Sequence, residues 1–356
     1  MKPRQRIDVG VVGATGLVGQ RLVSRLEGHP WFALRVLAAS ERSTGRSYGD
    51  AVDWRLPGRV PAYAADLEVR PATPAALADC RLVFSSLDPA SARPLEGALV
   101  DSGLPVVSNS SAFRMDGAVP LLVPEVNASH LDLLSRRRTG AGFIVTNSNC
   151  SVIGLALVLG PLHRAFGVRR VVVTTMQAVS GAGIDGPRAM ELIDNIVPFI
   201  PREEEKMETE LRKILGTCTA GGIQEADIAV SAHCHRVPTQ DGHLECASVE
   251  LGSSASPTDV QRVLEEFESE IADLGLPAAP ARPVIVDLRP DRPQPRLDRD
   301  TGGGMSVVVG RLRACSVLGI KLELLSHNTV RGAAGGTLLV AELLAARGFL
   351  EEEPRP

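Results

Sequence analysis

Residues 7–19 read IDVGVVGATGLVG, and this stretch decides the fold of the first half of the chain. The run Ile7–Val12 is typical of a short buried strand. Glycines at positions 13, 16 and 19 allow a sharp turn in which the backbone can approach a pyrophosphate. The helical pattern of Leu17–Leu26 follows and offers free N–H groups to an anion, and the apolar run Leu34–Ala39 comes next. Strand, glycine turn, helix and strand together predict a parallel sheet of Rossmann type that binds a dinucleotide.

The end of the second strand indicates which dinucleotide is bound. Ser40-Glu41-Arg42-Ser43 places a guanidinium between hydroxyl groups, which suits the 2′-phosphate of NADP because arginine binds phosphate bidentately. Glu41 is the competing feature, since an acidic residue here can hold the ribose hydroxyls instead. We predict NADP. The residues expected to contact it in this part of the chain are Gly13, Ala14, Thr15, Gly16, Leu17, Val18, Gly19, Ser40, Arg42 and Ser43.

The pattern of apolar segments changes after Cys150, which predicts a second domain. Leu82–Ser86 and Pro105–Ser108 read as further strands of the first sheet, and Ser151–Leu162 reads as an apolar helix. Longer strands, typical of a mixed or antiparallel sheet, are expected at Arg170–Met176, Ala229–Ala232, Leu244–Val249 and Met305–Arg311. The polar segment Pro277–Gly304 reads as a long loop, and Ala333–Ala346 as an apolar helix.

These elements predict an α/β fold of two domains. The first is a Rossmann-type dinucleotide-binding domain of residues 1–149, completed by the C-terminal helix 329–356. The second is an α+β catalytic and dimerisation domain of residues 150–328 with a mixed sheet.

The composition excludes several classes of function. A chain of 356 residues with 44% hydrophobic and 22% charged residues has the make-up of an ordinary globular protein of two domains. Its net charge of −4 does not favour a nucleic acid or a membrane surface as a partner. The six cysteines include no CxxC pair, and His233-Cys234-His235 has no matching third ligand, so no metal site is predicted. The chain runs into its first strand without an apolar leader, so we expect a cytoplasmic protein.

Cys150 is the candidate nucleophile. It follows the strand-like run Phe143–Val145 and precedes an apolar helix, whose N-terminus is expected to stabilise a thiolate while its N–H groups receive an oxyanion. By itself a lone cysteine is more often a small core residue. A histidine is the usual proton acceptor for such a thiol, but seven histidines leave the choice open. His243 lies seven residues after Arg236, across a predicted hairpin turn at Val237–Gly242.

Eight ordered segments make the chain resemble the aspartate-semialdehyde dehydrogenase family over nearly its whole length. They are GATGLVG at 13–19, SNSSAFR at 108–114, VPEVN at 123–127, SNCS at 148–151, QAVSGAG at 177–183, EEEKM at 203–207, HRVPTQDGH at 235–243 and RGAAGG at 331–336. Ser148 departs from the family, which usually has proline before the Asn-Cys pair. The run at 293–313 resembles a divergent branch of the family.

The resemblance implies a role for each residue of these segments. Cys150 would form a thioester, His243 would act as its base, Gln177 would position the acyl group, and Asn149 belongs to the same catalytic set. Arg236 would bind the substrate carboxylate. The remaining candidates are Arg114 and Ser111 for phosphate, Glu203 and Lys206 for the substrate amine and phosphate, Ser180 and Gly181 for the cofactor, and Asn328 for its nicotinamide. The run Glu203–Glu205 leaves the choice of acid open by one position.

The implied activity is the NADPH-dependent reductive dephosphorylation of L-aspartyl 4-phosphate to L-aspartate 4-semialdehyde, in the lysine, threonine and methionine branch of amino-acid biosynthesis. A homodimer or a dimer of dimers is expected, with small-molecule substrates as partners. A malonyl-CoA reductase, or another acyl-phosphate or acyl-thioester reductase, would share almost every motif and is the alternative. A nucleotide-binding sensor would not need Cys150, Arg236 and His243 together, and a thiol hydrolase would not need the glycine turn.

Overall fold

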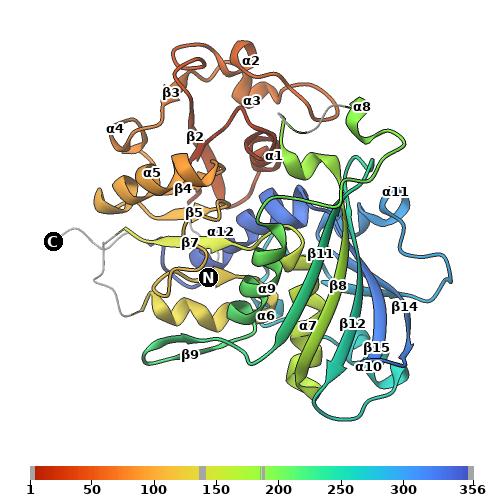
Figure 1. Cartoon of the computed structure of the whole chain (residues 1–356). Coiled ribbons are helices and arrows are strands. Elements are labelled where there is room, and N and C mark those ends of the chain that lie inside the picture. Colours follow the sequence, from red (N-terminus) through yellow and green to blue (C-terminus); the bar gives the residue numbers. More distant parts are fainter. Residues whose placement is uncertain (1–4, 136–141, 185, 187–188, 352–356) are drawn as a thin grey trace.

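The computed structural model of the chain describes residues 5–135, 142–184, 186 and 189–351. These residues form two sheets, each packed against helices (Figure 1). The strands of the first sheet are all parallel and lie in the order β3 (Val69–Pro71), β2 (Phe32–Ala39), β1 (Ile7–Val12), β4 (Leu82–Ser85), β5 (Val106–Ser108), β7 (Ile144–Asn147) and β6 (Leu121–Leu122).

The first sheet confirms the predicted Rossmann type. Its strands are apolar because helices cover both faces of the parallel sheet and bury them. α1 (Leu17–Leu26) begins directly after the glycine turn, and α12 (Gly335–Ala346) comes from the far end of the chain. Side chains of both helices join the same buried cluster as β1. α5 (Pro89–Asp101) packs within a second cluster on this sheet. The order β3-β2-β1-β4-β5 places the carboxyl ends of β1 and β4 beside the glycine turn.

The second sheet is mixed, as predicted. Its strands lie in the order β11 (Ala229–Arg236), β8 (Val168–Gln177), β12 (His243–Leu251), β15 (Gly319–Ser326), β14 (Val307–Cys315) and β13 (Val284–Asp287). The buried cluster of this domain draws on all six strands and on α7 (Val152–Phe166), α9 (Glu203–Ile214) and α10 (Pro257–Glu265). The burial of the strands alternates, and Val172 on β8 is 44% exposed. The sheet therefore has one face turned to the core and one face turned outward.

The predicted hairpin between Arg236 and His243 is wrong. β8 lies between β11 and β12, parallel to the first and antiparallel to the second. As an interior strand, the long β8 satisfies its backbone hydrogen bonds on both sides, and the 237–242 segment crosses its end. Arg236 pairs with Gln177, and Leu244 pairs with Met176. The C-terminal ends of β8 and β11 and the N-terminal end of β12, which carry Gln177, Arg236 and His243, consequently lie side by side at one end of the sheet.

The predicted loop at 277–304 is wrong in part. It contains β13, which pairs in parallel with β14 at the edge of the mixed sheet. The apolar run Val284-Ile-Val is only three residues long and lies among prolines and charged residues. The composition of the whole 277–304 segment therefore predicts a loop and hides this strand. The strand β15 was not expected at all. The last helix ends at Ala346 after a π-helical turn, Val330–Ala334, and residues 352–356 of the expected C-terminal helix lie outside the described residues.

The remaining elements are short. They are α2 (Tyr48–Ala51), α3 (Ala62–Ala65), α4 (Pro74–Leu77), α6 (Pro124–Asn127), α8 (Ala189–Leu192), α11 (Pro295–Asp298), the strands β9 (Thr217–Thr219) and β10 (Gly222–Gln224), and 3-10 turns at Ala128–Leu133, Val179–Ala182, Ala272–Leu274 and Thr301–Gly304. Within the described ranges, every helix is too short or too polar to span a bilayer.

Candidate active site

Cys150 and His243 come together from the ends of strands in the two sheets. Cys150 lies in the turn between β7 and α7, and His243 is the first residue of β12. The Sγ atom of Cys150 is 3.3 Å from Nε2 of His243. Cys150 is partly buried, whereas the imidazole is completely buried. The sequence placed these residues 93 positions apart, and only the docking of the two sheets makes them a pair.

The hydrogen bonds of His243 define its tautomer. The backbone N–H of Ala178 donates to Nδ1 at 3.0 Å. Nδ1 of the neutral ring is therefore an acceptor, and the ring proton is on Nε2, directed at the sulfur. In this arrangement His243 donates a hydrogen bond to Cys150 rather than accepting its proton.

The pKa of the Cys150 thiol is raised, contrary to the expected lowering. Burial and the negative charge of Glu203 raise the pKa of Cys150 to about 12, although Lys206, Arg114 and Arg236 act in the opposite direction. Burial, together with the positive charge of Arg236, lowers the pKa of His243 to about 3. Both groups are thus neutral at physiological pH, and the resting pair is a thiol beside a neutral imidazole.

Asn149 occupies two of the backbone donors at the start of α7. Its Oδ1 accepts the N–H groups of Ser151 at 2.8 Å and of Val152 at 3.2 Å. These two helix-terminal donors are capped by a side chain and are not free for sulfur or for an oxyanion. The N–H of Cys150 itself, by contrast, meets no acceptor among the residues that the structure describes.

Glu203, in the first helical turn of α9, is the acid that contacts the segment between β7 and α7. Glu203 accepts a hydrogen bond from Nδ2 of Asn149 at 2.8 Å and one from Nζ of Lys206 at 3.0 Å. Burial tends to raise the pKa of Glu203, but Lys206 and Asn149 outweigh it and the pKa is lowered. Glu204 instead accepts the N–H of Cys234, and Glu205 is exposed. Glu203 is therefore the member of the acidic run that belongs to the site.

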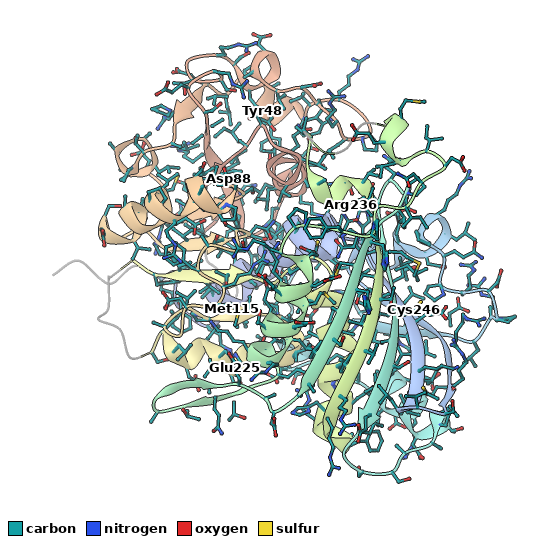
Figure 2. The ribbon with its side chains drawn as sticks, viewed as in Figure 1. Tyr48, Asp88, Met115, Glu225, Arg236 and Cys246 are labelled. Carbon is teal, nitrogen blue, oxygen red and sulfur yellow. The ribbon has the colours of Figure 1, made fainter. Side chains whose placement is uncertain are left out.

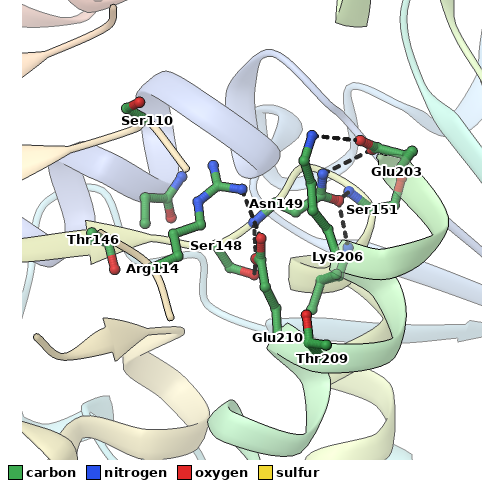
Figure 3. Close-up of polar contacts among 12 residues, drawn as sticks. Ser110, Arg114, Thr146, Ser148, Asn149, Ser151, Glu203, Lys206, Thr209 and Glu210 are labelled. Atoms are coloured by element: carbon green, nitrogen blue, oxygen red, sulfur yellow. Dashed lines mark hydrogen bonds and ion pairs between the residues drawn. The ribbon is translucent and has the colours of Figure 1, made fainter. Parts of the chain in front are cut away.

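Arg114 lies on the other side of the turn between β7 and α7 (Figure 3). Its NH1 donates to Oε1 of Glu210 at 2.9 Å and its NH2 to the carbonyl oxygen of Asn109 at 2.7 Å. Ser111 is partly buried in the loop that carries this arginine. Glu210 was not identified from the sequence. The signal was its spacing, since residues 203, 206 and 210 repeat at three and four positions and share one face of a helix.

The ends of β8 and β11 form another side of the site. Arg236 is buried at the end of β11, with NH1 donating to the carbonyl oxygen of Ala178 at 2.7 Å (Figure 2). Gln177 is buried and donates from Nε2 to the hydroxyl of Thr175 at 3.2 Å. A Cβ at Gly181 would come within 2.9 Å of Arg236 NH1 and 3.2 Å of the His243 ring, so glycine permits this close approach.

Two more of the motifs meet behind the cysteine. Arg331 and Glu125 form an ion pair that is completely buried, with one N–O distance of 2.6 Å. The pair anchors the π-helical turn against α6. A Cβ at Gly332 would lie 2.7 Å from the Cβ of Cys150. The glycine after Arg331 therefore lets this turn pack directly against the cysteine.

The glycine turn has the form of a dinucleotide site. Gly13 has a φ of +75°, and a Cβ at Gly19 would lie 2.2 Å from the carbonyl oxygen of Gly13. Gly16 caps α1 without a side chain, which leaves the first N–H groups of the helix open. At the end of β2, Ser40 and Arg42 are exposed, whereas Ser43 is buried.

A set of contacts connects this turn to the cysteine site. Arg21 on α1 lies 3.6 Å from Asp241. The next residue, Gly242, donates its N–H to Oδ1 of Asn328, and Nδ2 of Asn328 donates to the hydroxyl of Ser180 at 2.8 Å. The Ser180 and Asn328 pair thus lies between α1 and His243. His233 and His235 sit elsewhere on β11, and the described part of the chain contains no group of three side chains arranged to bind a metal.

Comparisons with known proteins agree with this geometry. Family descriptions named semialdehyde dehydrogenase, NAD binding domain, and semialdehyde dehydrogenase, dimerisation domain, match residues 8–134 and 159–331. A curated aspartate-semialdehyde dehydrogenase of Methanothermobacter thermautotrophicus is 47% identical, over 95% of this chain and 99% of its own length. The enzyme of Archaeoglobus fulgidus is 48% identical, over 95% and 98%. The crystal structure of the Candida albicans enzyme with NADP superposes with a TM-score of 0.90 at 41% identity, covering 96% of this chain and 99% of that one.

Proposed function

The chain belongs to the aspartate-semialdehyde dehydrogenase family, and on that basis we propose that Cys150 is its nucleophile and His243 the partner that supports it. The observation that carries the proposal is the 3.3 Å contact between Sγ and Nε2 at the edge where the strands of both domains meet. The protein is an NADP-dependent oxidoreductase. In the reductive direction it converts L-aspartyl 4-phosphate to L-aspartate 4-semialdehyde and releases phosphate.

The malonyl-CoA reductase raised as an alternative is not supported. Eight curated relatives that match nearly the whole chain, at 41% to 48% identity, are aspartate-semialdehyde dehydrogenases.

The glycine turn fits NADP, because only residues without a side chain allow the close approach of Gly19 to Gly13 and leave the start of α1 open. Residues 13–19 would hold the pyrophosphate, and Ser40, Arg42 and Ser43 the 2′-phosphate. Ser180, Gly181 and Asn328 would border the nicotinamide, close to His243. When bound, NADPH supplies the hydride that reduces the acyl group.

Each cation around the cysteine would bind a different charged group of the substrate. Arg236 would bind the α-carboxylate, because it is buried and has donors beyond the one that Ala178 occupies. Arg114 would bind the phosphate together with Ser111. Glu203 and Lys206 would bind the amino group and the phosphate, and Gln177 would orient the acyl group. Asn149 would position the thiol by holding the start of α7.

The thioester step balances without a separate base. The thiol of Cys150 and the acyl phosphate give a thioester and hydrogen phosphate: the S–H bond and the C–O bond to phosphate break, a C–S bond forms, and the thiol proton forms an O–H bond on the leaving phosphate. His243 keeps its proton and donates a hydrogen bond from Nε2–H, first to the sulfur and later to the former carbonyl oxygen. The N–H of Cys150 is the second donor available to that oxygen.

The test is NADP reduction with aspartate semialdehyde and phosphate, with and without Cys150→Ser. Loss of the nucleophile is expected to cost several orders of magnitude in kcat. NADP binding, followed by fluorescence, should be unchanged. More than a trace of activity in the variant would reject the thioester. Malonyl-CoA, assayed as a second substrate, should give no comparable rate.

The domain limits, assembly and location are also proposals. We divide the chain at 149/150 and assign residues from 329 onward to the first domain, because α12 packs in its core. A homodimer, or a dimer of dimers, through the outer face of the mixed sheet is supported by the family description of residues 159–331 as a dimerisation domain. Light scattering that finds a monomer would reject it. Free thiols at all six cysteines are in keeping with a cytoplasmic enzyme.

A further inference from the structure

Glu210 is a buried carboxylate that joins two parts of the site. It is 1% exposed and lies two turns after Glu203 on α9. Its Oε1 accepts NH1 of Arg114 at 2.9 Å. Its Oε2 accepts the backbone N–H of Asn149 at 2.7 Å and the hydroxyl of Ser148 at 3.2 Å. One side chain therefore touches both the arginine assigned to phosphate and the residue before the nucleophile (Figure 3).

Glu210 is not needed simply to attach α9 to the arginine loop. Lys213, one turn further along the helix, already does so. Its Nζ donates to the carbonyl oxygens of Arg114 at 2.6 Å, Asp116 at 2.7 Å and Val119 at 2.8 Å. The backbone of the loop is thus anchored by Lys213, and what Glu210 adds is the orientation of the guanidinium.

The guanidinium of Arg114 keeps donors for a ligand. Its Nε is buried without a hydrogen-bond partner among the described residues. NH1 and NH2 each use one bond to the protein and have a second hydrogen. A buried donor without an acceptor is costly unless something binds there, and a phosphate oxygen is the acceptor that suits a guanidinium.

Asn149 is held from two sides by carboxylates. Glu203 accepts its side-chain Nδ2–H, and Glu210 accepts its backbone N–H. Each carboxylate also accepts a hydrogen bond from a cation, Lys206 or Arg114. The chain of contacts runs Lys206, Glu203, Asn149, Glu210, Arg114, and Cys150 follows its central residue.

We propose that Glu210 is a positioning residue that sets the phosphate-binding guanidinium at a fixed place relative to the nucleophile. The inference rests on the proposed phosphate role of Arg114. A carboxylate can accept hydrogen bonds on both oxygens, so it can hold Arg114 and Asn149 at once. A glutamine can accept on only one side and presents an N–H to a donor on the other. Misplacement of either group would move the phosphate away from the acyl carbon to which the sulfur bonds.

The test is Glu210→Gln in the phosphorylating direction, with phosphate and aspartate semialdehyde varied separately. The KM for phosphate is expected to rise at least about tenfold, because one end of a buried charge-assisted contact is lost. The KM for aspartate semialdehyde should change by less than about threefold, since Arg236 is not in contact with Glu210. Glu270→Gln, which alters a Glu–Arg pair with Arg164 far from the cysteine, is the matched control and should leave both constants unchanged.

A double-mutant cycle separates this inference from the assignment on which it rests. If Glu210 acts through Arg114, its substitution should have little further effect on the phosphate KM in an Arg114→Ala background. Fully additive effects, or an unchanged phosphate KM in Glu210→Gln, would overturn the positioning role. An unchanged phosphate KM in Arg114→Ala alone would instead reject the phosphate assignment. If the glutamine variant does not fold, as judged by NADP binding and Tm, Glu210→Asp tests the same point because the shorter side chain cannot span both partners.

Discussion

Two strand-to-helix turns of the same parallel sheet are built in opposite ways. The turn after β1 is made of glycine, has no side-chain cap, and leaves the first N–H groups of α1 open. The turn after β7 is filled by side chains, since Asn149 caps α7 and is itself held by Glu203 and Glu210. The first turn can bind phosphates through its backbone. At the second the backbone donors are largely used, so the proposed chemistry would depend on side chains: a thiol, an imidazole and the cations around them.

The two turns also differ in the charged groups that surround them. The glycine turn needs no ionisable group, because the helix end itself attracts the anion. The cysteine turn is bordered by three cations and two buried carboxylates, and burial together with Glu203 raises the pKa of the thiol. We therefore expect the first turn to respond to added volume and the second to lost hydrogen bonds.

Gly19→Ala is the strongest way to break the glycine turn. A Cβ would lie 2.2 Å from a backbone oxygen, which cannot be relieved by a side-chain movement. We expect a loss of about 3 kcal/mol in the free energy of unfolding and no measurable NADP binding. Chemical denaturation and cofactor fluorescence measure the two effects. Gly97→Ala, at a helical glycine of α5 with nothing within 4 Å, adds the same methyl group without crowding and serves as the control. Normal NADP affinity in Gly19→Ala would refute the close approach.

Asn149→Ala tests the opposite turn. The substitution removes the cap of α7 and the bond to Glu203, while the backbone bond to Glu210 remains possible. We expect kcat to fall about a hundredfold through misplacement of the thiol, with a stability loss of about 1 kcal/mol. NADP affinity should not change, and fluorescence titration checks this. Ser256→Ala, which removes the cap of α10, should cost similar stability without loss of activity. If Asn149→Ala retains full kcat, the side-chain cap has no part in the chemistry.

Arg42→Ala sharpens the account of the nucleotide end. Arg42 is exposed and forms no ion pair with any residue described in the structure, so its removal should not affect folding. The KM for NADP is expected to rise about tenfold through loss of a charge-assisted contact, while the KM for NAD stays nearly constant. Steady-state kinetics with both cofactors give the answer. Equal changes for NADP and NAD would rule out the 2′-phosphate assignment, and Glu41→Ala provides the neighbouring comparison.

Thiol alkylation gives the smallest effect and reports on protonation. Because the pKa of Cys150 is raised to about 12, its labelling rate should rise continuously between pH 7 and pH 10 without levelling off. Hydrogen bonds from the backbone of Leu318 and Val317 lower the pKa of Cys315, so that thiol should react earlier in the same range. Mass spectrometry of each site over the pH series distinguishes them. A plateau for Cys150 near neutral pH would show that the thiolate already exists without substrate.

The local pattern predicted the glycine turn well. The bounds of β1 and α1 agree with the predicted Ile7–Val12 and Leu17–Leu26 because apolar period, glycine spacing and helix start lie within twenty consecutive residues. The eight family segments likewise placed the cysteine, the histidine and the arginines in one site. Their assignment needed no knowledge of contacts, only the order of motifs along the chain.

The sequence by itself determined the fold class and the position of the nucleotide turn, because both depend on residues close together in the chain, and the order of its motifs named the candidate reacting groups. Only the tertiary structure decided that β8 separates β11 from β12, that Nε2 of His243 carries the proton, and that Glu210 joins Arg114 to Asn149. Glu210 and Asn149 are 61 positions apart, and Ala178 and His243 are 65 apart. Hydrogen bonds across such separations arise from the packing of whole elements, and a change in pKa arises from burial. Neither leaves a periodic trace in the local sequence.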